Sequence, residues 1–382
     1  MMETRSIQSR DLVDLRVKLT NLARNIRRTT IPDDVELIYP QSSRDDTVFF
    51  KGSVLKRKRI VLLAPACVTA TCTMCPLPNE ALDRKTRPIS PEQIIQQFES
   101  SFEGERSLDD YELITVYNNG NFFADLELDR AVRKHIYKRV GESKASILVV
   151  ESLPQFITPE KVEEAKELLG QKELAVAIGL QSSNDLVREL AVNSTCTKAA
   201  FERAVRLLGE NGYKPLTFLM IKPPFLTEKE GIEDAVGSIK YLASLGIDDP
   251  ILCATRVAPN TVAMLLREKG LFNPPWIWSV VEVLKKSSTV SPSSRPRVVL
   301  SELKPEINLD SACPQNCDLC STRIIDLIDS YNKTGDVKVF RDADCDCRET
   351  YKAYVDSVEK DMGRVSLLER VRDFLDGILI ES

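Results

Sequence analysis

IVLLAPACVTATCTMC, residues 60–75, joins an apolar run to a short loop that holds three cysteines. The run 60–66 is aliphatic, as expected of a strand that is buried on both faces of a parallel sheet. Cys67, Cys72 and Cys75 follow it directly. In parallel β/α folds, chemistry gathers in the loops at the carboxyl ends of the strands. This stretch therefore predicts the fold class and a functional centre at the end of its first strand.

The same alternation of an apolar strand and an amphipathic helix continues along the chain. Further strands are predicted at residues 112–118, 146–152, 173–182, 215–222 and 249–257, with an edge strand at 295–303. Helical patterns lie between them, at residues 91–102, 125–140, 159–169, 197–212, 228–246 and 274–286. Parallel strands joined by helical crossovers make an α/β fold. The number of these units fits a partial (β/α)6 barrel better than a complete eight-unit barrel.

Three parts of the chain are predicted from changes in this pattern. Residues 1–58 form an N-terminal helical and basic extension, with a helix at 11–28, and residues 59–302 form the partial barrel. Residues 303–382 form a small Cys-rich domain that ends in one or two helices over 347–379. A segment with so little apolar core of its own is typical of a domain held together by metal.

Composition excludes several classes of protein. Of the 382 residues, 43% are hydrophobic and 29% are charged, which is ordinary for a soluble globular chain. No apolar stretch approaches about 18 residues, so no transmembrane span is expected. The N-terminus lacks the apolar core of a secretion signal, which predicts a cytoplasmic location. The single histidine, His135, excludes His-rich zinc sites. The net charge of −5 gives no global electrostatic case for nucleic acid.

The ten cysteines are clustered rather than dispersed. Beside the triplet, the clusters comprise Cys313, Cys317, Cys320, Cys345 and Cys347, whereas Cys196 and Cys253 stand apart. In a chain that is expected to be cytoplasmic, such clusters favour metal thiolates over disulfides.

The triplet has the ligand number of an open iron–sulfur cluster. Three thiolates hold three irons of a 4Fe–4S cluster and leave the fourth iron free for an exogenous ligand. A radical S-adenosylmethionine (SAM) enzyme needs this arrangement, because SAM chelates the open iron before its C–S bond is cleaved reductively. The alternative is a zinc knuckle with a fourth ligand elsewhere. The usual radical SAM triplet has three residues between its first two cysteines; here there are four, and Met74 stands where an aromatic residue usually contacts the adenine.

The C-terminal cysteines predict a second, closed metal site. Cys317, Cys320, Cys345 and Cys347 supply four thiolates for a structural zinc ion, with Cys313 as a substitute ligand. An auxiliary iron–sulfur cluster is the alternative, because thiolates bind both metals.

Several segments together resemble the radical SAM subunit of archaeosine synthase, in the group related to the Elongator catalytic subunit. These are CTMCPLPNEALD (72–83), VYNNGNFF (116–123), VVESLPQFI (149–157), VAIGLQSSNDLVRE (176–189), LMIKPPFLTEKEGIEDA (219–235) and NPPWIWSVVEVL (273–284). The resemblance covers about residues 60–350 and implies a 4Fe–4S cluster on the triplet. It also implies SAM contacts from Asn119, Gly120, Asn121, Glu151 and Gln181.

The resemblance further implies a substrate. In that family the enzyme acts on tRNA in which lysine is joined to the nitrile carbon of 7-cyano-7-deazaguanine, and lyase-type C–N cleavage leaves the formamidine of archaeosine. It implies tRNA, a partner enzyme of the same modification pathway and an external electron donor as partners.

Two local basic patches are the candidates for contacting phosphates. One holds Arg24, Arg27 and Arg28, and the other holds Lys51 and 56–59. The alternative is that they are solvated flanks of a helix and a strand. An overall acidic chain also fits radical chemistry on a small molecule or peptide, and a third hypothesis is a metal-binding scaffold without catalysis.

Overall fold

The fold is built on one eight-stranded sheet in which the strands follow one another in chain order. The structure, a computed structural model, describes residues 2–50, 52–104 and 106–381. The strands are β1 (Ser42–Phe50), β2 (Ser53–Val61), β3 (Leu113–Tyr117), β4 (Ile147–Glu151), β5 (Glu173–Gln181), β6 (Lys214–Ile221), β7 (Ile251–Ala254) and β8 (Arg297–Val298). β1 is antiparallel to β2, and every later pair is parallel. The predicted partial barrel is confirmed, including its edge strand.

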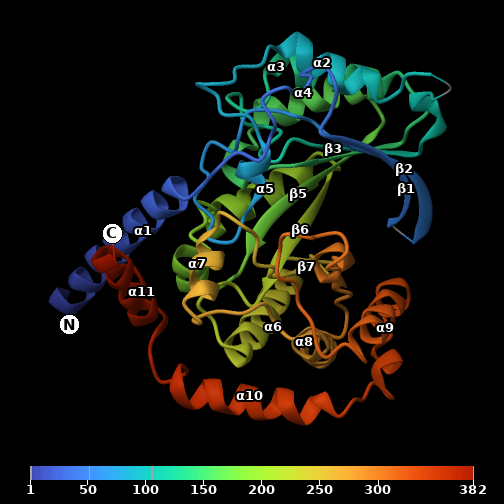
Figure 1. Cartoon of the computed structure of the whole chain (residues 1–382). Coiled ribbons are helices and arrows are strands. Elements are labelled where there is room, and N and C mark those ends of the chain that lie inside the picture. The colour runs from blue at the N-terminus through green and yellow to red at the C-terminus, as the bar shows by residue number, and fades with distance from the viewer. Residues whose placement is uncertain (1, 51, 105, 382) are drawn as a thin grey trace.

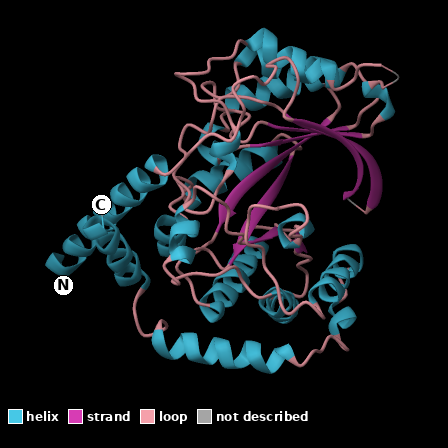
Figure 2. Ribbon diagram, in the orientation of Figure 1, coloured by secondary structure: helices cyan, strands magenta, loops and turns pink. Residues whose placement is uncertain are grey.

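Helices that lie between the strands in the chain cover the outer side of this curled sheet, whereas α1 and α11 lie together at a corner away from it (Figures 1 and 2). The helices are α1 (Met2–Asn25), α2 (Pro91–Ser100), α3 (Arg130–Gly141), α4 (Pro159–Leu169), α5 (Lys198–Glu210), α6 (Glu228–Ser244), α7 (Val262–Glu268), α8 (Ile277–Val290), α9 (Ser321–Thr334), α10 (Cys347–Asp361) and α11 (Leu367–Glu381). Capping boxes begin α2 at Ser90 and α6 at Thr227. In a capping box, two orphan N–H groups of the first turn are satisfied by side chains, so these helices begin at sharply defined residues.

The two faces of the sheet carry different side chains. Leu148 and Val150 of β4 point outward into the large core that the helices cover. Ile147 and Val149 point inward, into a smaller apolar cluster with Phe50 of β1. The edges of the sheet approach each other on this inner side, because Arg297 of β8 donates to the Phe49 carbonyl of β1 at 2.8 Å. The amino end of the half-barrel is therefore filled with apolar side chains.

The carboxyl end of the same inner face is different. Tyr117, Glu151, Gln181, Phe218 and Cys253 are only partly buried there, at or near the ends of five neighbouring strands. Within β5 the inner positions Ala175, Ala177 and Gly179 are small residues. The strand alternation thus places partly buried side chains, several of them polar, at the carboxyl edge of the sheet.

A second core joins the two ends of the chain. Leu15 and Leu19 of α1 pack with Val371 and Phe374 of α11, and the cluster extends to the π-helical turn η4 (Val187–Ala191) and to α7. Figure 1 shows α1 and α11 side by side, with both chain ends at this corner. The predicted N-terminal helix is confirmed, and the C-terminal segment forms two helices rather than one.

The first strand differs from the sequence expectation. β2 ends at Val61 instead of residue 66, and residues 62–66 continue with isolated contacts such as the bridge between Pro65 and Leu82. β1 was not predicted, and neither was α9 within the Cys-rich segment. Residues of α9 share the large core with α8. The boundaries at 58 and 303 remain predictions.

One basic patch is corrected by β1. Lys58 is fully buried and its ammonium lies 2.8 Å from Asp45. Arg57 binds Asp46 through two hydrogen bonds of 2.6 and 2.7 Å. Lys51 lies outside the described residues. Arg57 and Lys58 therefore hold β1 to β2 and are not free to contact phosphates. No helix in the described part of the chain is long and apolar enough to cross a membrane.

Replacing Asp45 by Asn should destabilise the fold, because it leaves the buried Lys58 charge without its partner. Since Asp45 is partly exposed, we expect the free energy of unfolding to fall by about 1–2 kcal/mol, less than the loss for a fully buried pair. Asp46→Asn is the matched control and should cost less than about 1 kcal/mol, because the Arg57 pair is nearer to solvent. Urea denaturation measures both, and equal losses would contradict the special burial of Lys58.

Candidate functional site

Strained backbone conformations gather around the carboxyl edge of the sheet. Asn119 after β3, Gln181 at the end of β5 and Lys222 after β6 all have positive φ, at 53°, 68° and 55°. Ala70, in the loop with the three cysteines, has φ 45°. Side-chain-bearing residues adopt this region only when the surrounding contacts impose it, and such residues concentrate at functional sites. We call residues 66–76 the cluster loop.

Two arginines, one in the last turn of α1 and one directly after it, hold the cluster loop on one side. Arg27 donates to the carbonyls of Ala70, Cys72 and Cys75, at 3.2, 3.4 and 3.0 Å. Arg24 donates twice to the Thr69 carbonyl. The predicted patch of three arginines is therefore largely occupied by the loop, and its expected role in contacting phosphates is corrected for Arg24 and Arg27.

A second support comes from the segment after η4. Thr73 donates its N–H to the Val192 carbonyl at 3.0 Å, and its hydroxyl donates to the Ala191 carbonyl. Thr71 and Asn193 exchange two side-chain hydrogen bonds with each other's backbone, at 2.8 and 2.9 Å. The middle of the loop, between Cys72 and Cys75, is thus fixed to the core of α1, α7 and α11.

Glu127 is the third support, and the sequence interpretation missed it. This carboxylate is 1% exposed and accepts the N–H of Val68 at 2.8 Å. It also accepts the backbone N–H of Asn121 and, at 2.7 Å, its side-chain amide. A Cβ on Gly120 would lie 2.0 Å from a Glu127 oxygen, so only glycine fits there. An acidic residue beside NNGN was the available signal.

Asn121 and Asn119 fix the turn after β3. Asn121 donates its side-chain amide to the Cys67 sulfur at 3.4 Å and accepts the Leu153 N–H at 2.7 Å. Asn119 donates to the carbonyl of Glu80, just beyond the cluster loop, at 3.0 Å. The turn formed by the predicted residues 119–121 therefore lies against the cluster loop. Its hydrogen bonds fix the segments at Glu80 and Leu153 beside that loop.

Glu151 and Gln181 are the last residues of β4 and β5, at the carboxyl edge of the sheet. Glu151 follows Val149 on the inner face, and burial raises its pKa to about 8, with the nearby Glu127 charge adding to the shift. N–H groups of Asn118 and Gly120 act in the opposite direction. Gln181 sits at an irregularity of the β5–β6 pairing, and its amide folds over Gly179, where a Cβ would lie 2.3 Å away.

Asn118, directly after β3, is a candidate ligand contact. It is completely buried, yet neither atom of its side-chain amide has a hydrogen-bond partner among the described residues. Buried polar atoms are almost always paired, so an unpaired amide at the carboxyl edge of the sheet is a feature of a site that binds a polar molecule. The methionine part of SAM offers an amine and a carboxylate, which fit the amide of Asn118 and the carboxyl group of Glu151, whereas the loop thiols would bind iron.

The three loop sulfurs do not converge on one point. Two thiolates on one zinc ion lie at most about 4.6 Å apart, since each Zn–S bond is about 2.3 Å. In the described ranges, the only group of three or more Cys, His, Asp or Glu ligand atoms within 4.8 Å of one another is elsewhere, so the sulfurs of Cys67, Cys72 and Cys75 do not all lie within that distance. The charges of Cys67 and Cys75 nonetheless raise the pKa of Cys72, beyond the rise from burial. The loop sulfurs as placed do not match three ligands of a single zinc ion.

Met74 contacts a hydrophobic core and not only the cluster loop. It is partly buried and packs against the core of α1, α7 and α11. Its contact with an adenine ring remains a prediction.

The group of four close ligand atoms is the predicted C-terminal set. Cys317, Cys320, Cys345 and Cys347 lie within 4.8 Å of one another, and we call them the four-cysteine centre. Three sulfur–sulfur distances are 3.6, 3.6 and 3.7 Å. Cys313 is not a member; it lies toward Asn308 and Arg256 at the end of β7. The expectation that Cys313 can substitute as a ligand is therefore not supported by its position.

Both tryptophans of the chain contact the four-cysteine centre or the helix that follows it. Trp278 is 2% exposed and donates its indole N–H to the Cys347 sulfur at 3.3 Å. Trp276 packs against Tyr351 and Tyr354 of α10. The WIW sequence at the start of α8 thus joins the centre to the barrel.

A buried polar path runs through the same region. Lys222 and Glu228 form an ion pair of 2.7 Å, with both side chains almost fully buried. Glu228 also accepts from Ser279, which lies 3.0 Å from the Tyr351 hydroxyl. Lys222 is therefore paired inside the protein, and the path links β6, α6 and α8 to α10.

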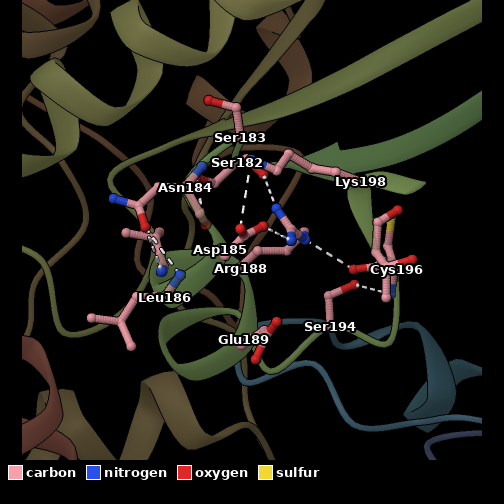
Figure 3. A network of polar contacts seen from close by, with 12 residues as sticks. Ser182, Ser183, Asn184, Asp185, Leu186, Arg188, Glu189, Ser194, Cys196 and Lys198 are labelled. Atoms are coloured by element: carbon pink, nitrogen blue, oxygen red, sulfur yellow. Dashed lines mark hydrogen bonds and ion pairs between the residues drawn. The ribbon is translucent and has the colours of Figure 1, made fainter. Parts of the chain in front are cut away.

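A second network supports the end of β5, as Figure 3 shows. Arg188 of η4 is 1% exposed and donates to the carbonyls of Ser182 and Cys196, at 3.0 and 2.9 Å, and to Asp185. Ser182 in turn donates to Asp234 of α6 at 2.6 Å. These hydrogen bonds join groups within the protein, so we interpret the network as support for η4. The carbonyls at the end of η4 in turn accept hydrogen bonds from Thr73 of the cluster loop.

Comparison with known proteins supplies homologues. A protein named archaeosine synthase subunit beta from Methanosarcina acetivorans is 27% identical over 322 residues, covering 82% of this chain and 89% of the relative. A protein of the same name from Thermococcus kodakarensis is 29% identical over 288 residues, covering 75% and 86%. No protein-family model matches the chain. These homologues confirm the resemblance predicted from the sequence segments.

Among solved structures, the Elp3 protein of Methanocaldococcus infernus with an N-terminal deletion matches with a TM-score of 0.43 and 16% identity. The match covers 63% of this chain and 59% of that chain.

Glu151 should make stability depend on pH. Its folded pKa of about 8 lies above the ordinary value of 4.5, so the folded state binds the proton more tightly than the unfolded state. The contribution is therefore complete below about pH 4.5 and is lost as pH rises through about 8. We expect metal-free Glu151→Gln to gain stability over the parent progressively between these values. Denaturation midpoints measured from pH 5 to 9 check this, and a constant difference would contradict it.

Proposed function

We propose that this chain is a radical SAM enzyme that reductively cleaves SAM at a 4Fe–4S cluster held by Cys67, Cys72 and Cys75. The observation that carries the proposal is the position of the cluster loop after β2, at the carboxyl edge of a half-barrel, with three thiols that do not all lie within 4.8 Å of one another. A bound cluster would supply the electron that breaks the sulfonium C–S bond of SAM.

The chain's own residues would bind and orient the SAM molecule. Asn118 offers an unpaired amide, and Glu151 offers a carboxyl group at the carboxyl end of β4, on the inner face of the sheet. Gln181 offers an amide at the end of β5, suited to ribose hydroxyls. Asn121 hydrogen-bonds the Cys67 sulfur and so stabilises the thiolate form that binds iron.

The proposed substrate is a modified tRNA. Support comes from the two homologues named archaeosine synthase subunit beta, which match most of this chain and most of their own length. The reaction would be C–N cleavage of the lysine adduct of a 7-deazaguanine, leaving the formamidine group of archaeosine. The word subunit in those names also supports a partner protein, and an external donor would supply the electron.

For the four-cysteine centre we propose a structural zinc ion. Four thiolates around one zinc form a tetrahedron with edges of about 3.8 Å, given Zn–S bonds of about 2.3 Å. The observed 3.6–3.7 Å separations fit that geometry and are too short for four sulfurs on four different irons. The auxiliary iron–sulfur cluster is therefore the less favoured alternative.

SAM cleavage tests the catalytic proposal. After anaerobic reconstitution with iron and sulfide, dithionite and SAM should yield 5′-deoxyadenosine. Cys72→Ala should abolish this product because it removes an iron ligand, whereas Cys313→Ala should retain it because that thiol belongs to neither metal site. A confirmed 4Fe–4S cluster that cleaves no SAM, with or without tRNA, would support the scaffold hypothesis instead.

The substrate is tested separately with tRNA that carries the lysine adduct. Conversion to the formamidine base is expected, and the unmodified tRNA is the control. Cleavage of SAM without any change in the adduct would direct attention to a small molecule or peptide.

Metal analysis and fluorescence test the zinc site. We expect about one zinc per chain before reconstitution, lost in Cys317→Ser but retained in Cys67→Ser. Because both tryptophans lie at this centre or on the α10 contact beside it, chelation should shift their emission to longer wavelength. Iron and sulfide retained by the Cys67→Ser variant would contradict the zinc assignment.

A further inference from the structure

Three arginines lie at the end of α1 or directly after it, and their guanidinium groups have different targets. Arg28 donates to the carbonyls of Asn25, the last residue of α1, and of Arg27. Among the described residues, Arg24 donates to the Thr69 carbonyl. Arg27 alone reaches three carbonyls of the cluster loop, two of them belonging to the predicted iron ligands Cys72 and Cys75. Side chains of equal charge thus make very different contacts.

The helix that precedes Arg27 is firmly placed. Leu15, Leu19 and Ala23 are buried in the core shared with α11 and η4. α1 ends at Asn25, so Arg27 follows it after one intervening residue. The positive φ of Ala70 bends the loop at the point where its carbonyl accepts from Arg27. The guanidinium is therefore held between the end of a packed helix and the turn of the cluster loop.

The Arg27 charge lies against the backbone of two predicted iron ligands, because its guanidinium donates to the carbonyls of Cys72 and Cys75 at 3.4 and 3.0 Å. Within the described ranges, no carboxylate forms an ion pair with Arg27, so its field is not cancelled by a direct partner. A partly buried positive charge favours the more negative of two redox states, because the local dielectric is lower than that of water.

We propose that Arg27 is a positioning residue that holds the cluster loop in its metal-binding shape and raises the reduction potential of the cluster bound there. The inference rests on the proposed function, since it needs a 4Fe–4S cluster on the loop. Net charge and hydrogen bonding around a cluster are established determinants of its potential. Arg27 would thus make the electron transfer that precedes SAM cleavage easier.

Charge and geometry are separable at this position. Lysine retains the positive charge but is a point donor, whereas the planar guanidinium donates to several acceptors in a fixed fork. Arg27→Lys should therefore preserve the potential better than it preserves the shape of the loop. Arg27→Gln should lose both. Arg28→Gln changes the net charge equally and is the matched control, because Arg28 donates to no cluster-loop carbonyl among the described residues.

The experiment is a redox titration of the reconstituted proteins, followed by the electron paramagnetic resonance signal of the reduced cluster. At the midpoint potential of the parent, the ratio of reduced to oxidised cluster in Arg27→Gln should fall about tenfold, which is 59 mV for one electron. Arg28→Gln and Arg27→Lys should stay within about threefold of the parent. Iron retained per chain should fall in both Arg27 variants and not in Arg28→Gln.

Hydrogen exchange of the metal-free proteins gives a second readout. Amides of residues 69–75 should exchange faster in Arg27→Gln than in Arg28→Gln, while α1 itself stays protected. A parent with a reducible cluster and an Arg27→Gln variant that matches Arg28→Gln in potential and exchange would overturn this inference and leave the proposed function standing. A parent that forms no 4Fe–4S cluster would overturn the proposed function and the inference with it.

Discussion

The cluster loop is hydrogen-bonded to the carboxylate of Glu127 at one end and to the guanidinium of Arg27 along the rest, and the candidate site depends on both. Glu127 accepts the N–H beside Cys67, and Arg27 donates to the carbonyls at Ala70, Cys72 and Cys75. A loop that has left its strand still needs partners for its backbone groups, because an unpaired buried group costs about 1–3 kcal/mol. Here the charged side chains bind backbone groups of the loop, so the cysteine sulfurs are not needed for these hydrogen bonds and remain available to bind metal.

The distant parts of the chain meet at this loop. α1 and α11 pack together against η4, and the carbonyls just after η4 hold Thr73. Arg188 keeps η4 in place from inside, through its bonds to Ser182 and Cys196. The first and last helices therefore belong to the support of the site, although they are outside the barrel. Loss of either would loosen the loop through the core that they share.

The four-cysteine centre serves a different part of the molecule. Its indole contact through Trp278 and the polar path from Lys222 to Tyr351 attach α10 to the outer helices of the barrel. A closed metal site here would stabilise the fold, whereas an open metal site is useful only at the carboxyl edge of the sheet. The close grouping of the four C-terminal sulfurs and the wider placement of the loop sulfurs agree with the two different roles that we propose.

The sequence by itself determined the partial barrel, because the alternation of apolar strands and amphipathic helices is a local pattern; α4 begins and ends at the predicted residues 159 and 169. It also indicated both cysteine groups through their short spacings. Only the tertiary structure decided the partners of the charged residues: Lys58 with Asp45, Arg27 with the cluster loop, and Glu127 with Val68. The exclusion of Cys313 from the four-cysteine centre was decided in the same way. The sequence shows which side chains are charged and so can form strong hydrogen bonds and ion pairs. Their partners depend on which distant segments the fold brings within about 3 Å.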